Sequence, residues 1–279
     1  YSRGLCYYLG GQCTPALVEF ERGASHEYLD AVGGETRGEL PESEEPPGDG
    51  NPPVRWDIGL NHSIGAIVLW HCGFPERAKQ WCATALALTE RIEEAYGKSF
   101  YLCQAALLAA RLRDWPNLGT YAAQSHEIAV DSGFTLLAGW SGALLGWRDA
   151  MTGDGDRGRA DLKEGIAMAK ASGTLANQAI FETLLAQTCL RDGLAEEGLR
   201  AIARANEAAD QTSSHEWEVE TLRVRAGLFR LMDKNGQEAE EGCLHKAIGL
   251  ARAQRARSLE LRCTVSLGRL LVARGRASE

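Results

Sequence analysis

The sequence predicts an all-α fold, a right-handed superhelical solenoid of helix pairs with a period of about 40 residues. Breaks in the helical pattern recur at Gly11, Gly73, Asp114, Gly153, Gly193, Gly236 and Gly275. Successive breaks lie about 40 residues apart, and the longer first interval reaches the same length once the segment 33–54 is left out. A fixed period of this length is typical of helical repeats, which bury their apolar faces by stacking on neighbouring repeats.

Small residues recur at fixed places after each break, which supports the same period. Five positions after the first five breaks stand Ala16, Ala78, Gly119, Gly158 and Gly198. Twelve positions after them stand Gly23, Ala85, His126, Gly165 and Ala205, where His126 is the exception. Residues seven apart share a helix face, so small side chains there let a neighbouring helix approach closely. The pattern is that of tetratricopeptide-like (TPR-like) repeats with lengthened loops.

The individual helices follow from the apolar periodicity between the breaks. The first pair comprises a segment through Leu9 and residues 14–32, where Thr14 and Pro15 supply a cap and a proline at the first helical position. The later pairs are predicted at 56–72 and 75–96, 99–112 and 116–132, 136–151 and 157–171, 175–191 and 195–211, and 217–232 and 237–254, with a last helix at 257–274.

The chain divides into three parts. Residues 1–32 form a first TPR-like repeat, and we expect it to be truncated at its N-terminus because an apolar run is already under way at Leu5. Residues 33–54 form an acidic insert rich in proline and glycine, which is predicted to be a loop because few apolar groups offset its ordering entropy. A lure for a basic partner is the alternative for this insert. Residues 55–279 hold five further TPR-like helix pairs and a final unpaired helix.

Charge and cysteine content narrow the class of protein. The formal net charge of −8 argues against nucleic-acid binding, which calls for a basic surface. Residues 250–279 carry seven arginines against two glutamates, either as a solvated helix face or as a basic docking patch. The eight cysteines form no Cys-x-x-Cys pair, which is typical of small buried side chains in a reducing compartment. No apolar stretch is long enough to span a membrane, so we expect a cytoplasmic protein.

Catalytic and metal-binding motifs are not convincing in this sequence. The run 153–158, GDGDRG, has the spacing of a dinucleotide loop, but it follows a predicted helix and carries two carboxylates that would repel pyrophosphate. As a calcium loop it would have Gly165 where the twelfth-position glutamate belongs. The six histidines lack the spacing of zinc ligands. We therefore expect no enzyme activity, no cofactor and no metal.

Aromatic and charged residues give candidates for a binding groove. The first helices of such pairs line the concave surface of the array, where extended partners bind. Trp140 and Trp147 are seven residues apart and share one helix face, in the groove or in the core between repeats. The candidate groove residues are Trp56, Asp57, Asn61, Trp140, Trp147, Glu182, Glu220, Arg223 and Arg262. The glutamates and arginines form either ion pairs between repeats or a clamp for an anionic ligand or peptide terminus.

The repeat region also resembles a known bacterial group. The run 66–78, AIVLWHCGFPERA, is similar to the Leu-Trp, Gly-aromatic-Pro, Ala pattern of that group, and further matches are 131–134, DSGF, and Gly146-Trp147, and 258–267. The group is the TPR-like C-terminal region of multidomain signalling proteins that join a class III adenylate or guanylate cyclase to a signal-transduction ATPase. The group's Asp-Pro-Gly before this helix is Asp57-Ile58-Gly59 here, without the proline.

The resemblance implies a regulatory role in signal transduction. It predicts a non-catalytic sensor or scaffold that binds a protein segment or a small inducer and regulates cyclase or ATPase domains N-terminal to it. The cyclase and ATPase motifs themselves are absent from these residues. The alternative is a structural element that drives homo-oligomerisation by pairing the apolar faces of unfinished repeats at its ends.

Overall fold

The protein is all-helical in the computed structural model, which describes residues 2–32, 56–92, 94–232 and 234–276. No strand occurs in these ranges. The helices are α1 (Ser2–Leu9), α2 (Cys13–Val32), α3 (Trp56–His71), α4 (Pro75–Thr89), α5 (Ala95–Leu112), α6 (Trp115–Asp131), α7 (Thr135–Thr152), α8 (Gly155–Ala171), α9 (Gln178–Arg191), α10 (Ala195–Thr212), α11 (Glu218–Arg230), α12 (Lys234–Gln254) and α13 (Arg257–Ala273). The acidic insert, 33–54, lies outside the described residues.

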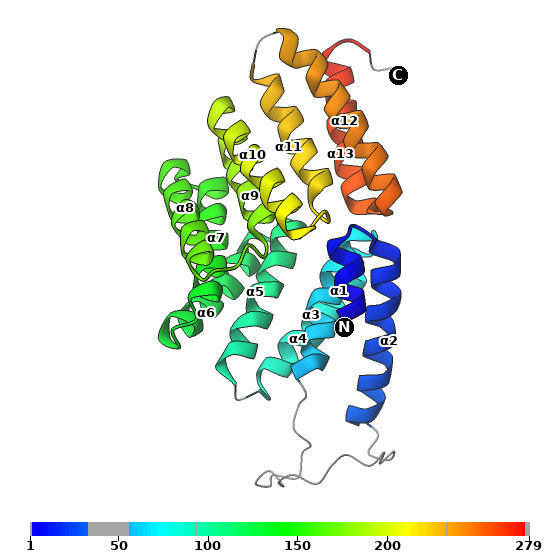
Figure 1. The fold of residues 1–279 in the computed structure, drawn as a ribbon, viewed down its shortest axis with the longest axis vertical. Coiled ribbons are helices and arrows are strands. Elements are labelled where there is room, and N and C mark those ends of the chain that lie inside the picture. The colour runs from blue at the N-terminus through cyan, green and yellow to red at the C-terminus, as the bar shows by residue number, and fades with distance from the viewer. Residues whose placement is uncertain (1, 33–55, 93, 233, 277–279) are drawn as a thin grey trace.

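The helices form two layers (Figure 1). From α3 onward, each odd-numbered helix contacts the next odd-numbered helix, and α13 contacts α3. The odd-numbered helices α3 to α13 therefore close a ring within the described part of the chain. The even-numbered helices from α4 to α12 pack mainly against the helix before and the helix after them. They form the outer layer.

Hydrogen bonds between distant segments join α13 to α3, and join the segment before α11 to α1 and α12. The Ser258 hydroxyl at the start of α13 donates to the carbonyl oxygen of Trp70 in α3. The backbone N–H of His215 donates to the carbonyl oxygen of Leu9 over 2.7 Å. Gln254 Nε2 at the end of α12 donates to the carbonyl oxygen of His215 over 3.2 Å. Segments up to 188 residues apart are thus held side by side.

Four helix boundaries differ from the sequence prediction by three residues or more. Helix α4 ends at Thr89, and α5 begins at Ala95, because the Glu94 carboxylate caps α5 by accepting the N–H of Gly97 over 3.2 Å. Helix α9 begins at Gln178 because Asn177 takes a left-handed conformation, with φ of 59°. Gly236 falls within the first turn of α12.

The tightest helix packing is between α7 and α8, and it depends on glycine. Gly139 and Gly146 of α7 face Gly165 and Gly158 of α8. A Cβ atom at any of the four would collide with backbone atoms of the other helix. The prediction that small residues at this spacing permit close approach is confirmed here.

His126, the exception in the small-residue pattern, is accommodated by a glycine. Its Nδ1 lies 3.1 Å from the carbonyl oxygen of Ala138 and 3.2 Å from the hydroxyl of Ser141. Gly142 lies one turn on from Ala138, and a Cβ there would be only 3.3 Å from His126 Cε1. The absence of a side chain at Gly142 on the facing helix therefore makes room for the larger His126 side chain.

Large aromatic side chains and most of the cysteines lie in the core of the protein. The largest fully buried side chains include Trp147, Tyr101, Phe20 and Phe181. Six of the eight cysteines are buried, as predicted for small apolar side chains, and all eight are free thiols.

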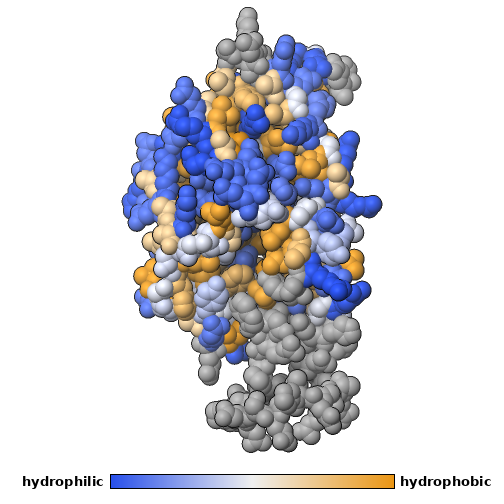
Figure 2. Space-filling model, in the orientation of Figure 1, coloured by the Kyte–Doolittle hydropathy of each residue, from blue (hydrophilic) through white to orange (hydrophobic). Residues whose placement is uncertain are grey.

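Hydrophobic side chains are interleaved with hydrophilic ones over the middle and upper part of the face in Figure 2. Within the described ranges, no helix has the length and apolar character that a membrane span requires.

We predict that Gly146→Ala destabilises the protein by about 1 to 3 kcal/mol, because the added methyl group forces α7 and α8 apart. Gly249→Ala is the matched control. Gly249 is also helical, but a Cβ there meets nothing within 4 Å, so alanine should stabilise α12 by about 0.5 to 1 kcal/mol. Urea unfolding measures both changes. Equal effects of the two substitutions would contradict the close packing described here.

Candidate functional site

A cavity of about 480 Å³ lies on the inner side of the ring of odd-numbered helices. Its size is within the range of small-molecule binding sites. Its walls are mainly apolar, and the apolar lining comes from Leu5, Tyr8, Leu9, Ile64, Ile67, Phe100, Leu107, Trp140, Leu175, Ala176 and Ile180. The polar lining comes from Gln104, Arg111, Thr174, Asn177, Thr212, Ser214 and Glu216. Apolar walls with a few polar groups are typical of a ligand site.

Helix α5 supplies two of the polar groups. Between Tyr101 and Leu112 its sequence is YLCQAALLAARL, in which Gln104 and Arg111 interrupt an otherwise apolar run. The two residues are seven apart and therefore lie on one helix face, two turns from each other. Both are buried and both line the cavity.

Arg111 is a buried cation that faces this cavity. Only 4% of the residue is exposed. Its Nη1 donates to the carbonyl oxygen of Leu107 over 3.0 Å, and the guanidinium stacks on the Trp217 ring at 4.6 Å. Its Nε has no hydrogen-bond partner, and no carboxylate of the described residues lies within 4.0 Å of it. A buried charge is normally paired, so Arg111 is an unusual feature of this site.

Glu216 is the anionic counterpart of Arg111 in the lining of the same cavity. It immediately precedes α11, and only 3% of the residue is exposed. Its Oε2 has no hydrogen-bond partner. Burial raises the pKa of the Glu216 carboxyl from 4.5 to about 7, although the positive charge of Arg111 lowers it. This carboxyl is therefore partly protonated at neutral pH.

The Tyr8 hydroxyl lies close to both charges. Burial raises its pKa, the neighbouring Arg111 guanidinium lowers it, and the Glu216 carboxylate raises it further. The hydroxyl oxygen is 3.4 Å from His71 Nδ1. Tyr8, Arg111 and Glu216 thus form one polar corner in an apolar cavity, contributed by α1, α5 and the segment before α11.

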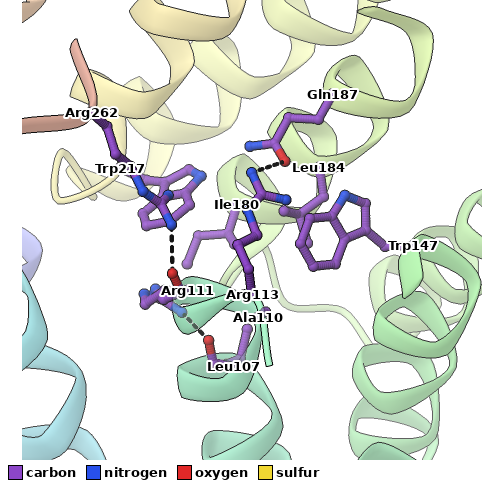
Figure 3. A pocket seen from close by; sticks show the side chains of 10 residues that line it. All are labelled: Leu107, Ala110, Arg111, Arg113, Trp147, Ile180, Leu184, Gln187, Trp217 and Arg262. Carbon is purple, nitrogen blue, oxygen red and sulfur yellow. Dashed lines mark hydrogen bonds between the residues drawn. The ribbon is translucent and has the colours of Figure 1, made fainter. Parts of the chain in front are cut away.

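An arginine and tryptophan cluster lies directly beside this corner (Figure 3). Arg113 extends toward Trp147, with its guanidinium 5.1 Å from the ring centre, and donates to the Gln187 amide oxygen over 3.4 Å. Arg262 stacks on Trp70 at 4.8 Å and donates to the carbonyl oxygen of Arg111. The space enclosed there is about 10 Å³, about enough for one water molecule. The cluster is a packed structural element.

Glu220 of α11 provides the charge that balances this cluster. Its carboxylate accepts hydrogen bonds from Arg223 at 2.7 and 2.8 Å and from Gln187 at 2.9 Å, and it lies 3.5 Å from Arg262 Nη1. Burial alone would raise the pKa of Glu220, but the charges of Arg223 and Arg262 hold it well below its ordinary value. The carboxylate therefore stays ionised at neutral pH.

The predicted groove residues fall into different surroundings. Trp140 lines the large cavity, while Trp147 and Arg262 line the small enclosed space. Glu220 and Arg223 form the ion network, and Glu182 accepts a hydrogen bond from Arg204 of α10 over 2.9 Å. These contacts favour structural ion pairs for the charged candidates. Asn61 is buried in α3 and does not line the large cavity. The side chains of Trp56 and Asp57 lie outside the described residues.

The glycine and aspartate run 153–158 has a structural role. Asp154 caps α8 by accepting the N–H groups of Asp156 and Arg157, each over 3.1 Å. Arg159 then bonds to Asp156 and to Asp192 at the end of α9. No group of three or more His, Cys, Asp or Glu side chains in the described ranges is arranged to hold a metal ion.

Sequence reasoning misses the polar corner itself. The interruption of an apolar helix by Gln104 and Arg111 is a usable signal, because polar residues seven apart in such a run mark one face. Glu216 gives no comparable signal, since it lies before a helix in a run of polar residues. Tyr8 comes near Arg111 only through the packing of α1 against distant segments, which the local pattern does not encode.

Comparison with known proteins identifies a distant relative. No family model matches the chain. An uncharacterized protein of Rhizobium meliloti (strain 1021) is 25% identical over 211 residues, which is 76% of this chain. The aligned segment spans 20% of the relative's length. The chain is thus similar to a segment of a much longer bacterial protein.

We predict that Glu220→Gln destabilises the protein by about 3 kcal/mol at pH 7, because two arginines lose their buried counter-charge. The pKa of Glu220 is lower in the folded than in the unfolded protein, so the ionised carboxylate stabilises the fold in full only above the unfolded-state pKa of about 4. As the pH falls from there toward the folded-state pKa this contribution is lost, and the difference in unfolding free energy between wild type and the variant should shrink.

Glu196→Gln is the control for this variant, because the Glu196 side chain is exposed and pairs with Arg200 at 3.8 Å. Its effect should stay within about 0.5 kcal/mol. Thermal and urea unfolding from pH 3 to pH 8 measure both. A Glu220→Gln variant as stable as wild type at pH 7 would contradict the role of this ion network.

Proposed function

We propose that this chain is a non-catalytic TPR-like module that binds a small inducer or a protein segment on the concave side of its helix pairs. It acts as a sensor or scaffold of a bacterial signalling protein in the cytoplasm, and regulates domains N-terminal to it. The observation that carries the proposal is the cavity of about 480 Å³, with apolar walls and buried polar atoms that lack partners.

The spacing of the helices supports the repeat interpretation. The odd-numbered helices from α3 to α13 begin at Trp56, Ala95, Thr135, Gln178, Glu218 and Arg257, at intervals of about 40 residues. Together with the two layers of helices, this regular spacing favours a superhelical array. Arrays of this kind present the inner helices to their ligands.

The regulatory part of the proposal rests on the resemblance of the run 66–78 to TPR-like regions of cyclase and ATPase signalling proteins. The cavity provides a physical basis for such regulation. Its lining comes from α1, α3, α5 and α7, from α9 and the end of α10, and from the segments before α9 and α11, so an occupant contacts helices that are far apart in the sequence. An occupant with different affinity for two arrangements of these helices would shift the equilibrium between them.

Ligand access can be tested with 1-anilinonaphthalene-8-sulfonate, an amphipathic dye that fluoresces in apolar sites. We predict that wild type binds one dye molecule and that Ala176→Trp, which fills the rim of the cavity, weakens binding at least tenfold. Ala83→Trp is the matched control, because Ala83 is also exposed but lines a hollow beside α4, α5 and α6. Equal dye binding by all three proteins would refute the cavity as a binding site.

A self-assembly element is the second candidate, and the exposed face of α13 favours it. Leu261, Val265 and Val272 lie on one side of this helix, and Leu261 and Val272 are 66% and 64% exposed. Gly268 is on the same side, with nothing within 4 Å of its Cβ position. An apolar face of this kind can pair with a second copy.

Light scattering over a range of concentrations tests this candidate. Self-assembly predicts a mass that rises with concentration in wild type and falls to that of a monomer in Leu261→Glu. Val130→Glu on α6 is the control, since Val130 is 54% exposed but away from α13. A wild type that stays monomeric at all concentrations rules this candidate out.

A further inference from the structure

We propose that the cavity binds a small zwitterion with an apolar side chain, namely an apolar α-amino acid or a dipeptide of such residues. The ligand carboxylate binds Arg111 and the ligand ammonium group binds Glu216. This inference rests on the proposed function, because it requires that the cavity is a binding site, and it names the chemical class of the ligand.

Arg111 defines the anionic end of the ligand. Its guanidinium is buried at the cavity wall, fixed by Leu107 and Trp217, and its Nε donor has no partner. A carboxylate is the group that a guanidinium recognises best, because its two oxygens match the planar array of N–H donors. Since the side chain is already held in place, little side-chain entropy is lost on binding.

Glu216 defines the cationic end. Glu216 lines the same cavity, and its buried Oε2 acceptor also lacks a partner. An ammonium group supplies three N–H donors and a positive charge, so it would pair with the ionised carboxylate. Arg111 and Glu216 line the same cavity, and both charges influence the pKa of the Tyr8 hydroxyl. They form no ion pair with each other within 4.0 Å, so neither charge has a direct partner of opposite sign among the described residues.

Only a ligand with both charges satisfies both residues. A ligand with a carboxylate but no ammonium group brings only acceptors, so Oε2 of the ionised Glu216 stays without a donor. A ligand with an ammonium group but no carboxylate leaves Arg111 Nε without an acceptor. Unpaired buried polar atoms cost free energy, so each of these ligands loses affinity. A zwitterion supplies both charged groups and adds no net charge to the cavity.

Highly charged anions fit this site poorly. Two other arginines lie nearby, but both already have partners. Arg113 contacts Gln187 and Trp147, and Arg262 contacts Glu220 and Trp70. One available guanidinium beside a carboxylate is a weak site for a phosphate group.

The remaining walls select an apolar side chain. Leu9, Ile64, Ile67, Phe100 and Trp140 face the cavity from α1, α3, α5 and α7. Transfer of an apolar side chain from water to such walls is favourable in proportion to the area buried. The volume of about 480 Å³ leaves room for a large aliphatic or aromatic side chain, or for a second residue.

The experiment compares ligands that differ by one charged group. The probes are L-phenylalanine, its analogue without the ammonium group, 3-phenylpropionate, and its analogue without the carboxylate, 2-phenylethylamine. L-leucine and the dipeptide L-leucyl-L-phenylalanine extend the series. Their displacement of bound 1-anilinonaphthalene-8-sulfonate gives the affinities, and calorimetry checks the stoichiometry. At least one zwitterion should bind, and at least tenfold more tightly than either of the two singly charged analogues.

Two variants test which residue binds which charged group of the ligand. Glu216→Gln should weaken binding of the zwitterion at least tenfold and remove its advantage over 3-phenylpropionate. Arg111→Met should remove its advantage over 2-phenylethylamine. Arg225→Met is the control, because Arg225 stacks on Phe229 of the same helix and does not line the cavity. Circular dichroism and dye binding verify that each variant is folded. The ligand series itself needs only wild-type protein.

The outcomes separate the two proposals. Binding of 3-phenylpropionate or 2-phenylethylamine as tight as that of the zwitterions overturns the paired recognition. Failure of all three zwitterions to displace the dye also overturns it, while dye binding that depends on Ala176 keeps the cavity as a binding site. Failure of wild type to bind the dye, with no heat from any of the probes, removes both proposals.

Discussion

The Arg262 side chain is the contact on which the closed arrangement depends. From α13 it stacks on Trp70 of α3, donates to the carbonyl oxygen at Arg111 of α5, and pairs with Glu220 of α11. One guanidinium therefore joins four helices that are far apart in the sequence. A planar cation with several donors can make a stacking contact, a hydrogen bond and an ion pair at once, which the ammonium group of lysine cannot do.

The closed arrangement determines which polar groups line the cavity. Tyr8 and Glu216 are far apart in the sequence and reach the same corner because α1 and the segment before α11 are held together there. In an open array these groups would be solvated. Inside the ring, burial raises the pKa of Glu216 to about 7 and leaves Arg111 without a carboxylate partner. The same contacts that close the fold therefore create its unpaired charges.

Local sequence patterns predict the helices and their close packing well. The spacing of Gly158 and Gly165 anticipates the contact between α7 and α8, because a missing Cβ has a direct steric consequence. Helix ends are harder to predict when a side chain sets them, as Glu94 does for α5. The candidate site is harder still. The helical period is enough to mark Trp140 as a groove candidate, but Arg111 and Glu216 acquire their properties only through burial by distant segments.

The contact between α13 and α3 also has a consequence for how the chain can change in length. An open array of helix pairs gains or loses a pair at little cost, since each pair contacts only its neighbours. Here an additional pair between α3 and α13 would separate Arg262 from Trp70 and the Ser258 hydroxyl from the Trp70 carbonyl oxygen. Closure thus fixes the number of helix pairs, and variation by duplication is confined to segments outside the ring.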